Sequence, residues 1–202
     1  MNTIVIIGII IFIIYIFLHI RFLYKINPNY DILQSKNPNK ENFEKIMNQK
    51  SPSIFTDIGK DWNIKEINKK NINKYFVYYL CPLLIKSKYD IKTINNDHKE
   101  KLTMENNNRH LILQLKGKSK FYLFNPEQSK YLYVKKNKSE VDYWNQDLKK
   151  YPLLNKSQFI EIIIHENQMI YIPKKWWYTY ESIDKGHLID CNSESLFSYF
   201  LG

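Results

Sequence analysis

Residues 159–182, FIEIIIHENQMIYIPKKWWYTYES, decide the fold of this chain. A β-branched run at 161–164 is followed by a polar turn at 165–168 and a second apolar run at 169–172. Pro173 ends the second run, because proline has no N–H to donate to a strand ladder. An extended aromatic pattern resumes after the tryptophan pair. The stretch therefore predicts three β-strands joined by short turns.

A second block, LILQLKGKSKFYLF at residues 111–124, has the same character. It predicts strands at 111–115 and 121–124 around a tight turn at 116–118, with Gly117 at a position that needs a positive φ. Asn125-Pro126 closes the second of these strands.

The two blocks resemble the core of the JmjC and cupin-like oxygenase group. In that group, an aromatic-Ile-Pro sequence is followed by two variable residues, a Trp and an iron-binding His. Tyr171-Ile172-Pro173 and Trp176-Trp177 match this pattern. The helical period at 42–51, the Pro-led strand at 52–56 and Asp61-Trp62 are similar to the opening of JmjC-type domains. The resemblance implies a mainly β fold, a double-stranded β-helix (jelly roll) with a few short flanking helices.

The resemblance also implies where iron and 2-oxoglutarate would bind. Members hold iron with a His-x-Asp/Glu pair and a distal His, which leaves positions open for the co-substrate and oxygen. Met104, Asn106 and Tyr178 fall on these ligand positions, and a thioether, a neutral amide and a protonated phenol are poor ligands for ferrous iron. Ser119 stands where many members place a lysine for 2-oxoglutarate. We therefore expect no catalytic residue, no metal and no cofactor. The side chains expected to line the remaining pocket are Met104, Asn106, Gln114, Trp176 and Tyr178.

One alternative retains an iron-binding site. His98-Lys99-Glu100 is itself a His-x-Glu triplet, six residues before the expected place. If the loop is longer than is usual in the family, His98 and Glu100 could hold Fe(II) for a 2-oxoglutarate-dependent reaction. The other interpretation is an exposed polar loop, since such a triplet arises readily in an Asn- and Lys-rich segment. His110 is expected to make an interior hydrogen bond, and the tryptophan pair to pack in the core.

The N-terminal residues predict a membrane anchor. Residues 3–20 are apolar and carry no charge, and 18 helical residues span about 27 Å, close to the hydrocarbon thickness of a bilayer. A cleaved signal peptide is disfavoured, because there is no basic leader and no small-residue cleavage site. Arg21 and Lys25 follow the segment and no Lys or Arg precedes it, which places the C-terminal domain on the cytoplasmic side of a single-pass protein. The predicted division is an anchor at 1–25, a polar tether at 26–42 and the cupin-like, JmjC-like domain at 43–202.

The composition of the chain limits the classes of molecule expected to bind it. The formal net charge is +10, from 30 Lys and Arg against 20 Asp and Glu, but arginine occurs only at positions 21 and 109. Arginine dominates base and phosphate recognition, and the lysines are scattered, so we do not expect nucleic acid as a partner. The abundance of Ile, Lys and Asn is typical of an AT-rich coding genome, such as that of a parasite, an endosymbiont or a large DNA virus. Cys81 and Cys191 are too few and too far apart for a disulfide framework, so we expect two buried thiols.

The remaining segments have less distinct patterns. Aromatic and β-branched residues predict a strand at 75–81. Asn42 is the expected N-cap of the first helix of the domain. The other expected elements are a loop or hairpin edge at 86–109, a strand at 131–135, a short helix at 141–150 and a closing strand at 196–200.

Three classes of function remain open on the sequence. The first is a membrane-anchored, non-catalytic cupin-like domain that binds a protein or a small molecule beside a lipid bilayer. The second is a membrane-tethered Fe(II)/2-oxoglutarate hydroxylase that uses His98 and Glu100. The third is a structural membrane protein of a virus particle, in which the domain supports assembly.

Overall fold

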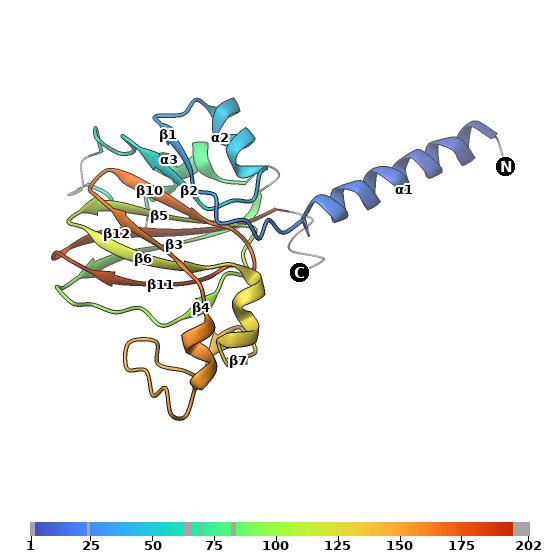
Figure 1. Ribbon diagram of the computed structural model, residues 1–202. Helices are drawn as coiled ribbons and strands as arrows, with labels where there is room; N and C mark the ends of the chain where they lie inside the picture. The colour runs from blue at the N-terminus through green and yellow to red at the C-terminus, as the bar shows by residue number, and fades with distance from the viewer. Residues whose placement is uncertain (1–2, 24, 63–65, 69, 82–83, 196–202) are drawn as a thin grey trace.

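The structure is a computed structural model that describes residues 3–23, 25–62, 66–68, 70–81 and 84–195 (Figure 1). The described fold is mainly β, as the sequence predicts, and consists of two six-stranded sheets with a few helices. The first sheet has the order β1-β2-β10-β5-β12-β3. Its strands are β1 (Leu33–Lys36), β2 (Ser53–Thr56), β3 (Leu84–Ile94), β5 (Arg109–Lys116), β10 (Gln168–Ile172) and β12 (Gly186–Ser195).

The second sheet has the order β7-β8-β4-β11-β6-β9. Its strands are β4 (Thr103–Met104), β6 (Ser119–Phe124), β7 (Val134–Lys135), β8 (Lys138–Ser139), β9 (Ile160–Ile164) and β11 (Trp177–Ser182). The three strands expected within residues 159–182 are confirmed as β9, β10 and β11. Because β9 and β11 lie in one sheet and β10 in the other, the chain alternates between the sheets here. This arrangement is consistent with a double-stranded β-helix.

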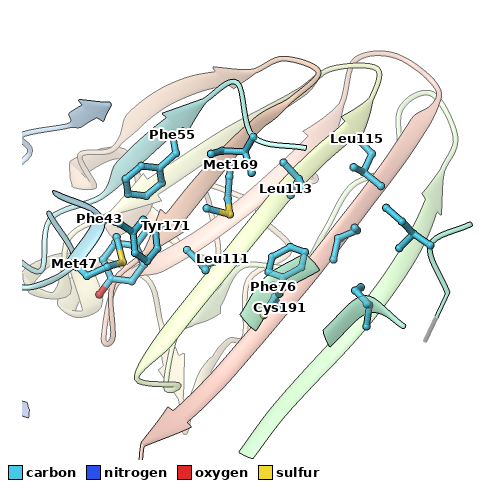
Figure 2. Close-up of a cluster of buried hydrophobic side chains, with 14 residues drawn as sticks. Phe43, Met47, Phe55, Phe76, Leu111, Leu113, Leu115, Met169, Tyr171 and Cys191 are labelled. Atoms are coloured by element: carbon cyan, nitrogen blue, oxygen red, sulfur yellow. The ribbon is translucent and has the colours of Figure 1, made fainter. Parts of the chain in front are cut away.

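Strand alternation produces three separate cores. Residues that point between the sheets, such as Ile112 on β5, Ile170 on β10 and Phe121 on β6, form the interior core. On the opposite face of the first sheet, a second cluster lies beneath α2 (Lys40–Met47) and α3 (Ile72–Phe76). Figure 2 shows Phe43 and Phe76 from these helices against Leu111 and Leu113 of β5.

The third cluster covers the outer face of the second sheet. It joins Leu102, Phe124 and Trp177 to Leu132 and Leu154, which lie in the long connection between β6 and β9. This connection contains two 3-10 helices, Pro126–Tyr131 and Pro152–Lys156. The cluster explains why Trp177 is fully buried although its neighbour Trp176 belongs to the interior core, since adjacent residues of an extended chain face opposite sides.

The turn between β5 and β6 is the one predicted from the sequence. Gly117 has a φ of +80°, and a Cβ at this position would lie 2.8 Å from the backbone oxygen of Lys185. Both the left-handed conformation and the close approach require glycine. The β5–β6 connection carries the chain from the first sheet to the second.

The segment expected to be a tether lies along the domain. Strand β1 pairs in parallel with β2, the indole N–H of Trp176 donates to the backbone oxygen of Asn27 (3.1 Å), and the Tyr30 hydroxyl donates to the backbone oxygen of Gln158 (2.8 Å). These contacts fasten residues 27–36 across one end of the two sheets.

Helix α1 (Thr3–Leu23) extends away from both sheets (Figure 1). Large apolar side chains are exposed along it, from Ile4 (76% exposed) to Leu18 (57%). Within the described residues, no helix combines the length and the apolar character required to cross a membrane. The anchor expected over residues 3–20 stays a prediction.

Two expected elements are wrong. The strand expected at 75–81 is instead the end of α3 followed by the 3-10 helix Val77–Tyr79. Ile72 and Phe76, four residues apart, are buried on one side of the helix, and this packing outweighs the strand propensity of the aromatic residues. The helix expected at 141–150 is a series of turns, in which the Asp142 and Asp147 carboxylates accept hydrogen bonds from backbone N–H groups two or three residues later.

Smaller differences concern element boundaries. Residues 86–94 of the segment expected to be a loop or a hairpin edge lie in β3, a long edge strand paired with β12. The expected strand at 131–135 shortens to β7, because the preceding residues complete a 3-10 helix. The N-cap of α2 is Asn39, whose side-chain oxygen accepts from the backbone N–H of Asn42 (2.8 Å). The strand expected at 196–200 lies outside the described residues.

Candidate functional site

Several polar side chains lie in the space between the two sheets, the barrel interior, and four of them come from the inward faces of β5 and β12. On β5, Leu111, Leu113 and Leu115 face the helices, so His110 and Gln114 share the inward face with Ile112. On β12, Asp190 and Asn192 are inward for the same reason. Asn192 lies directly opposite His110 in the β5–β12 register, which brings Asp190 and His110 together as diagonal neighbours.

His110 is held between two carboxylates. Its Nε2 lies 2.9 Å from Asp190 Oδ1, and its Nδ1 contacts the Glu105 carboxylate. The imidazole is 1% exposed and the Glu105 side chain 3%. A neutral imidazole carries one N–H, so only the doubly protonated ring can donate to both carboxylates. Burial lowers the pKa of His110, but the charges of Glu105 and Asp190 outweigh this and raise the pKa to about 10.

Lys92 links the His110 cluster to Glu100, beside the second sheet. Its Nζ lies 3.2 Å from Asp190 Oδ2 and 3.5 Å from Glu100 Oε2. The Tyr180 hydroxyl donates to the same Glu100 oxygen (3.3 Å). Burial raises the pKa of Asp190, yet His110 and Lys92 together hold it below its ordinary value. Five side chains make up this interior charge network: Lys92, Glu100, Glu105, His110 and Asp190.

Neutral amides complete the network. Glu105 Oε1 accepts hydrogen bonds from the backbone N–H (2.6 Å) and the side-chain amide (2.7 Å) of Asn107. The Asn107 amide also donates to Asn192 Oδ1 (3.0 Å), and Asn192 donates to Asp190 Oδ1 (3.1 Å). Both carboxylates beside His110 are therefore fixed by further donors, which restricts the imidazole to one orientation.

The three positions that the resemblance assigns to metal ligands do not converge. Met104 lies opposite Trp177 in the β4–β11 register and packs with the third cluster, on the outer face of the sheet. The Asn106 amide donates to the Met104 backbone oxygen (3.3 Å). Only Tyr178 faces His110, with ring centroids 5.2 Å apart, and burial followed by the charges of Glu105 and Asp190 raises the pKa of its phenol well above the ordinary value.

This donor set does not fit ferrous iron, because it offers a thioether, an amide and a protonated phenol in place of imidazoles and a carboxylate. In the part of the chain that the structure describes, no group of three or more His, Cys, Asp or Glu side chains has an arrangement that could hold a metal ion. The carboxylates nearest to His110 are instead engaged by protein cations and amides.

His98 and Glu100 are close but differ in their surroundings. His98 Nε2 lies 4.0 Å from Glu100 Oε2, and the His98 side chain is 41% exposed at the edge of the barrel. The Glu100 carboxylate is already bound by Lys92 and Tyr180. The structure thus places Glu100 in the interior charge network and His98 beside it.

The other expected pocket residues are buried in separate environments. Trp176 lies in the interior core against Tyr30, with ring centroids 5.9 Å apart. The Gln114 amide donates to the backbone oxygen of Lys116 (2.6 Å), while Gln114 Oε1 and Ser119 Oγ are buried without a hydrogen-bond partner among the described residues. The adjacent Lys120 points away from Ser119 and pairs with Glu161 (3.4 Å).

Sequence reasoning correctly gave His110 an interior hydrogen bond, but it missed Lys92, Glu105 and Asp190. Glu105 lies between two positions that the resemblance marks, and an alternating strand turns it to the opposite face from Met104. Lys92 and Asp190 come from edge and central strands that are far apart in sequence. The sequence offered one sign of this arrangement. Residues 188, 190 and 192 alternate with the apolar residues 189 and 191, so they share the opposite face of the strand.

Comparison with known proteins agrees with this architecture. Residues 105–192 match the family model of the cupin-like domain. Human tRNA wybutosine-synthesizing protein 5 is 37% identical over 78 residues, which make up 38% of this chain and 25% of that protein. Human HSPB1-associated protein 1 is 30% identical over 82 residues, or 37% of this chain and 17% of that protein.

JmjC domain-containing protein D of Dictyostelium discoideum is 30% identical over 86 residues, or 40% of this chain and 19% of that protein. The chain thus spans a quarter or less of the length of these relatives. The family-model match includes Glu105, His110 and Asp190 of the interior charge network, whereas Lys92 and Glu100 precede it. Residues 105–192, which contain β5, β10 and most of β12 in the first sheet and all strands of the second sheet except β4, are therefore similar to the cupin-like domain and to JmjC proteins.

Proposed function

We propose that this protein is a non-catalytic cupin-like module that binds a protein or a small molecule. In this proposal, protein cations inside the barrel neutralise its carboxylates, as a bound metal ion would. The imidazolium of His110 and the ammonium of Lys92 neutralise carboxylates that converge inside the barrel. The barrel then keeps its shape through its own side chains.

The observation that carries the proposal is the contact of both His110 ring nitrogens with carboxylates, those of the buried Glu105 and of Asp190, whose side chain is 13% exposed. A metal ligand must present a free lone pair, and an imidazolium has none. The Glu105 and Asp190 oxygens are likewise occupied by N–H donors. Supporting the same conclusion, the three positions that correspond to family ligands offer a thioether, an amide and a phenol.

We further propose that residues 3–20 attach the module to a lipid bilayer, with residues 43–202 on the cytoplasmic side. The supporting observations are that large apolar side chains lie exposed along α1 and that Arg21 and Lys25 follow this segment. Flotation of the full chain with neutral lipid vesicles, compared with residues 26–202, tests this proposal. Flotation of both or of neither would contradict it.

The module proposal is tested by titrating the full chain in detergent with Fe(II) under anaerobic conditions, with and without 2-oxoglutarate. We expect no tight binding by calorimetry and no shift of the melting temperature with either compound. Stoichiometric iron binding would overturn the proposal.

A second function, a hydroxylase with iron on His98 and Glu100, shares the same test. It is favoured by one observation, the contact of the Glu100 carboxylate with Lys92 and with Tyr180 of the interior core, 4.0 Å from His98 Nε2. It predicts iron binding that is lost in His98→Ala and retained in His165→Ala, which removes an exposed turn histidine as a matched control. Iron binding that survives His98→Ala would exclude this second function as well.

A further inference from the structure

A pocket of about 540 Å³ lies outside the barrel interior, beside the edge strands β4 and β8. Its walls come from Lys99, Lys101 and Leu102, which lead into β4, and from residues 138–144, which begin in β8. A volume of this size is typical of sites for small organic ligands, which range over roughly 300–1,000 Å³. The pocket shares no wall with His110 or Asp190, so it is separate from the site described above.

Three lysines give the pocket a local excess of positive charge. Lys99, Lys101 and Lys138 line it, and each is exposed at the surface. Within the described residues, neither Lys101 nor Lys138 forms an ion pair, and Lys99 lies over the Trp144 ring (5.2 Å to the centroid). Ammonium groups in this arrangement favour an anion with several oxygens, such as a phosphate.

The two carboxylates that line the pocket are already engaged. Glu140 pairs with Lys135 (3.4 Å), and Asp142 Oδ1 accepts from the Trp144 backbone N–H (3.1 Å). Neither forms an ion pair with the three pocket lysines in the described structure. Asp142 keeps free acceptor capacity at the pocket wall, which suits a hydroxyl donor on a ligand.

The remaining wall is aromatic and apolar. Tyr143 and Trp144 meet edge to face (5.3 Å between centroids), beside the buried side chains of Leu102 and Val141. The indole N–H of Trp144 donates to the Glu100 backbone oxygen (2.7 Å), which fixes the ring. Burial raises the pKa of Tyr143 to about 12, so its phenol stays neutral. A wall of this kind favours a flat ring system.

From these three kinds of contact we infer that the pocket binds a phosphorylated compound with hydroxyl groups and a flat ring, a ligand of mononucleotide size. The lysines hold the phosphate, Asp142 accepts from a hydroxyl, and the ring lies against Tyr143 and Trp144. Glu100 joins the two sites, because its backbone oxygen holds Trp144 and its carboxylate belongs to the interior charge network.

Calorimetry on the full chain in detergent tests this inference with four probes: adenosine monophosphate, guanosine monophosphate, adenosine and inorganic phosphate. We expect at least one nucleotide to bind, and both adenosine and phosphate to bind about tenfold or more weakly. Binding of the nucleotide should weaken as the salt concentration rises, since the lysines are exposed. Equal affinity for phosphate or for adenosine alone would overturn the inference, as would the failure of both nucleotides to bind.

Two double variants locate the binding. Lys101→Gln/Lys138→Gln should weaken nucleotide binding about tenfold or more, because it removes two charge-assisted contacts to the phosphate. Lys70→Gln/Lys156→Gln makes the same change in net charge at exposed lysines away from the pocket and should leave binding unchanged. Equal losses in the two variants would show a non-specific charge effect and would contradict the assigned site. The iron titration tests the proposed non-catalytic module, whereas nucleotide binding tests this pocket. Failure of one proposal can therefore be distinguished from failure of the other.

Discussion

The two faces of β5 show how one strand serves two purposes. On the outer face, Leu111, Leu113 and Leu115 enter an apolar cluster under α2 and α3 (Figure 2). On the inner face, the buried His110 lies between the carboxylates of Glu105 and Asp190. Both faces are equally excluded from water, yet one is stabilised by packing and the other by balanced charges. The outer face therefore tolerates the loss of a methyl group better than the inner face tolerates the loss of a charge.

The largest effect should come from removing the charge of His110. His110→Leu leaves Glu105 without its cation in a site that is almost fully buried, and it leaves Asp190 with Lys92 alone. Breaking a buried ion pair in this way costs about 3–5 kcal/mol of unfolding free energy. Urea denaturation of the full chain in detergent measures this loss.

A second substitution separates charge from packing at the same position. Glu105→Gln added to His110→Leu removes the uncompensated carboxylate, so the double variant should recover part of the lost stability. If the double variant is no more stable than His110→Leu, the cost arises from the shape of the leucine and the charge argument is wrong.

The matched change on the outer face is Leu113→Ala. Leu113 is fully buried among apolar side chains, so its truncation should cost about 2–4 kcal/mol through lost packing and a cavity. This loss should be the same at every pH in the range where the native state is stable. A loss that varied with pH as the His110→Leu loss does would remove the distinction between the two faces.

The pH dependence of stability sharpens the same comparison. The pKa of His110 is raised from 6.5 to about 10 on folding, so its contribution is fully present below pH 6.5 and declines as the pH rises towards 10. The wild-type unfolding free energy should therefore fall between pH 6.5 and about 8.5, by at most about 1.4 kcal/mol per pH unit.

The matched control for this dependence is His110→Gln, which has no proton to lose and should show a flatter profile. The chosen range stays below the ordinary pKa of 9.0 of the buried Cys191 thiol, whose own titration would add to the slope. The pKa of Asp190 is lowered, so its contribution is lost only in acid, below its ordinary value of 3.8. Parallel profiles for the two proteins would show that His110 is not protonated in the native state.

The contrast between the faces also explains what the sequence could predict. Strands β9, β10 and β11 were predictable because their β-branched runs are bounded by a turn and a proline. Helix α3 was not predictable, because its helical conformation depends on the packing of Ile72 and Phe76 in the second cluster. Local patterns determine where strands run, whereas packing partners decide the ambiguous segments.

The candidate site was predictable only in part. The resemblance marked the positions of Met104, Asn106 and Tyr178, and the expectation that they hold no iron stays a prediction. It could not indicate Lys92 or Asp190, because their importance depends on a strand pairing between residues almost 100 positions apart. The turn-built pocket at 138–144 was missed for a related reason, since aspartate side chains in local turns replaced the expected helix.

The smallest predicted effect concerns the ion pair between Arg109 of β5 and Glu44 of α2. Its guanidinium binds both Glu44 carboxylate oxygens (3.1 and 2.8 Å) and donates to the backbone oxygens of Tyr79 and Leu80. Arg109→Lys keeps the charge but cannot reproduce this planar set of donors, so it should cost about 1–2 kcal/mol. Lys45→Gln, which breaks an exposed pair with Glu41 on the same helix, is the control and should change the melting temperature little. Equal effects would mean that Arg109 acts as a simple surface charge. A larger loss for Arg109→Lys would show that the arginine fastens α2 to the end of β5 through its fixed set of donors.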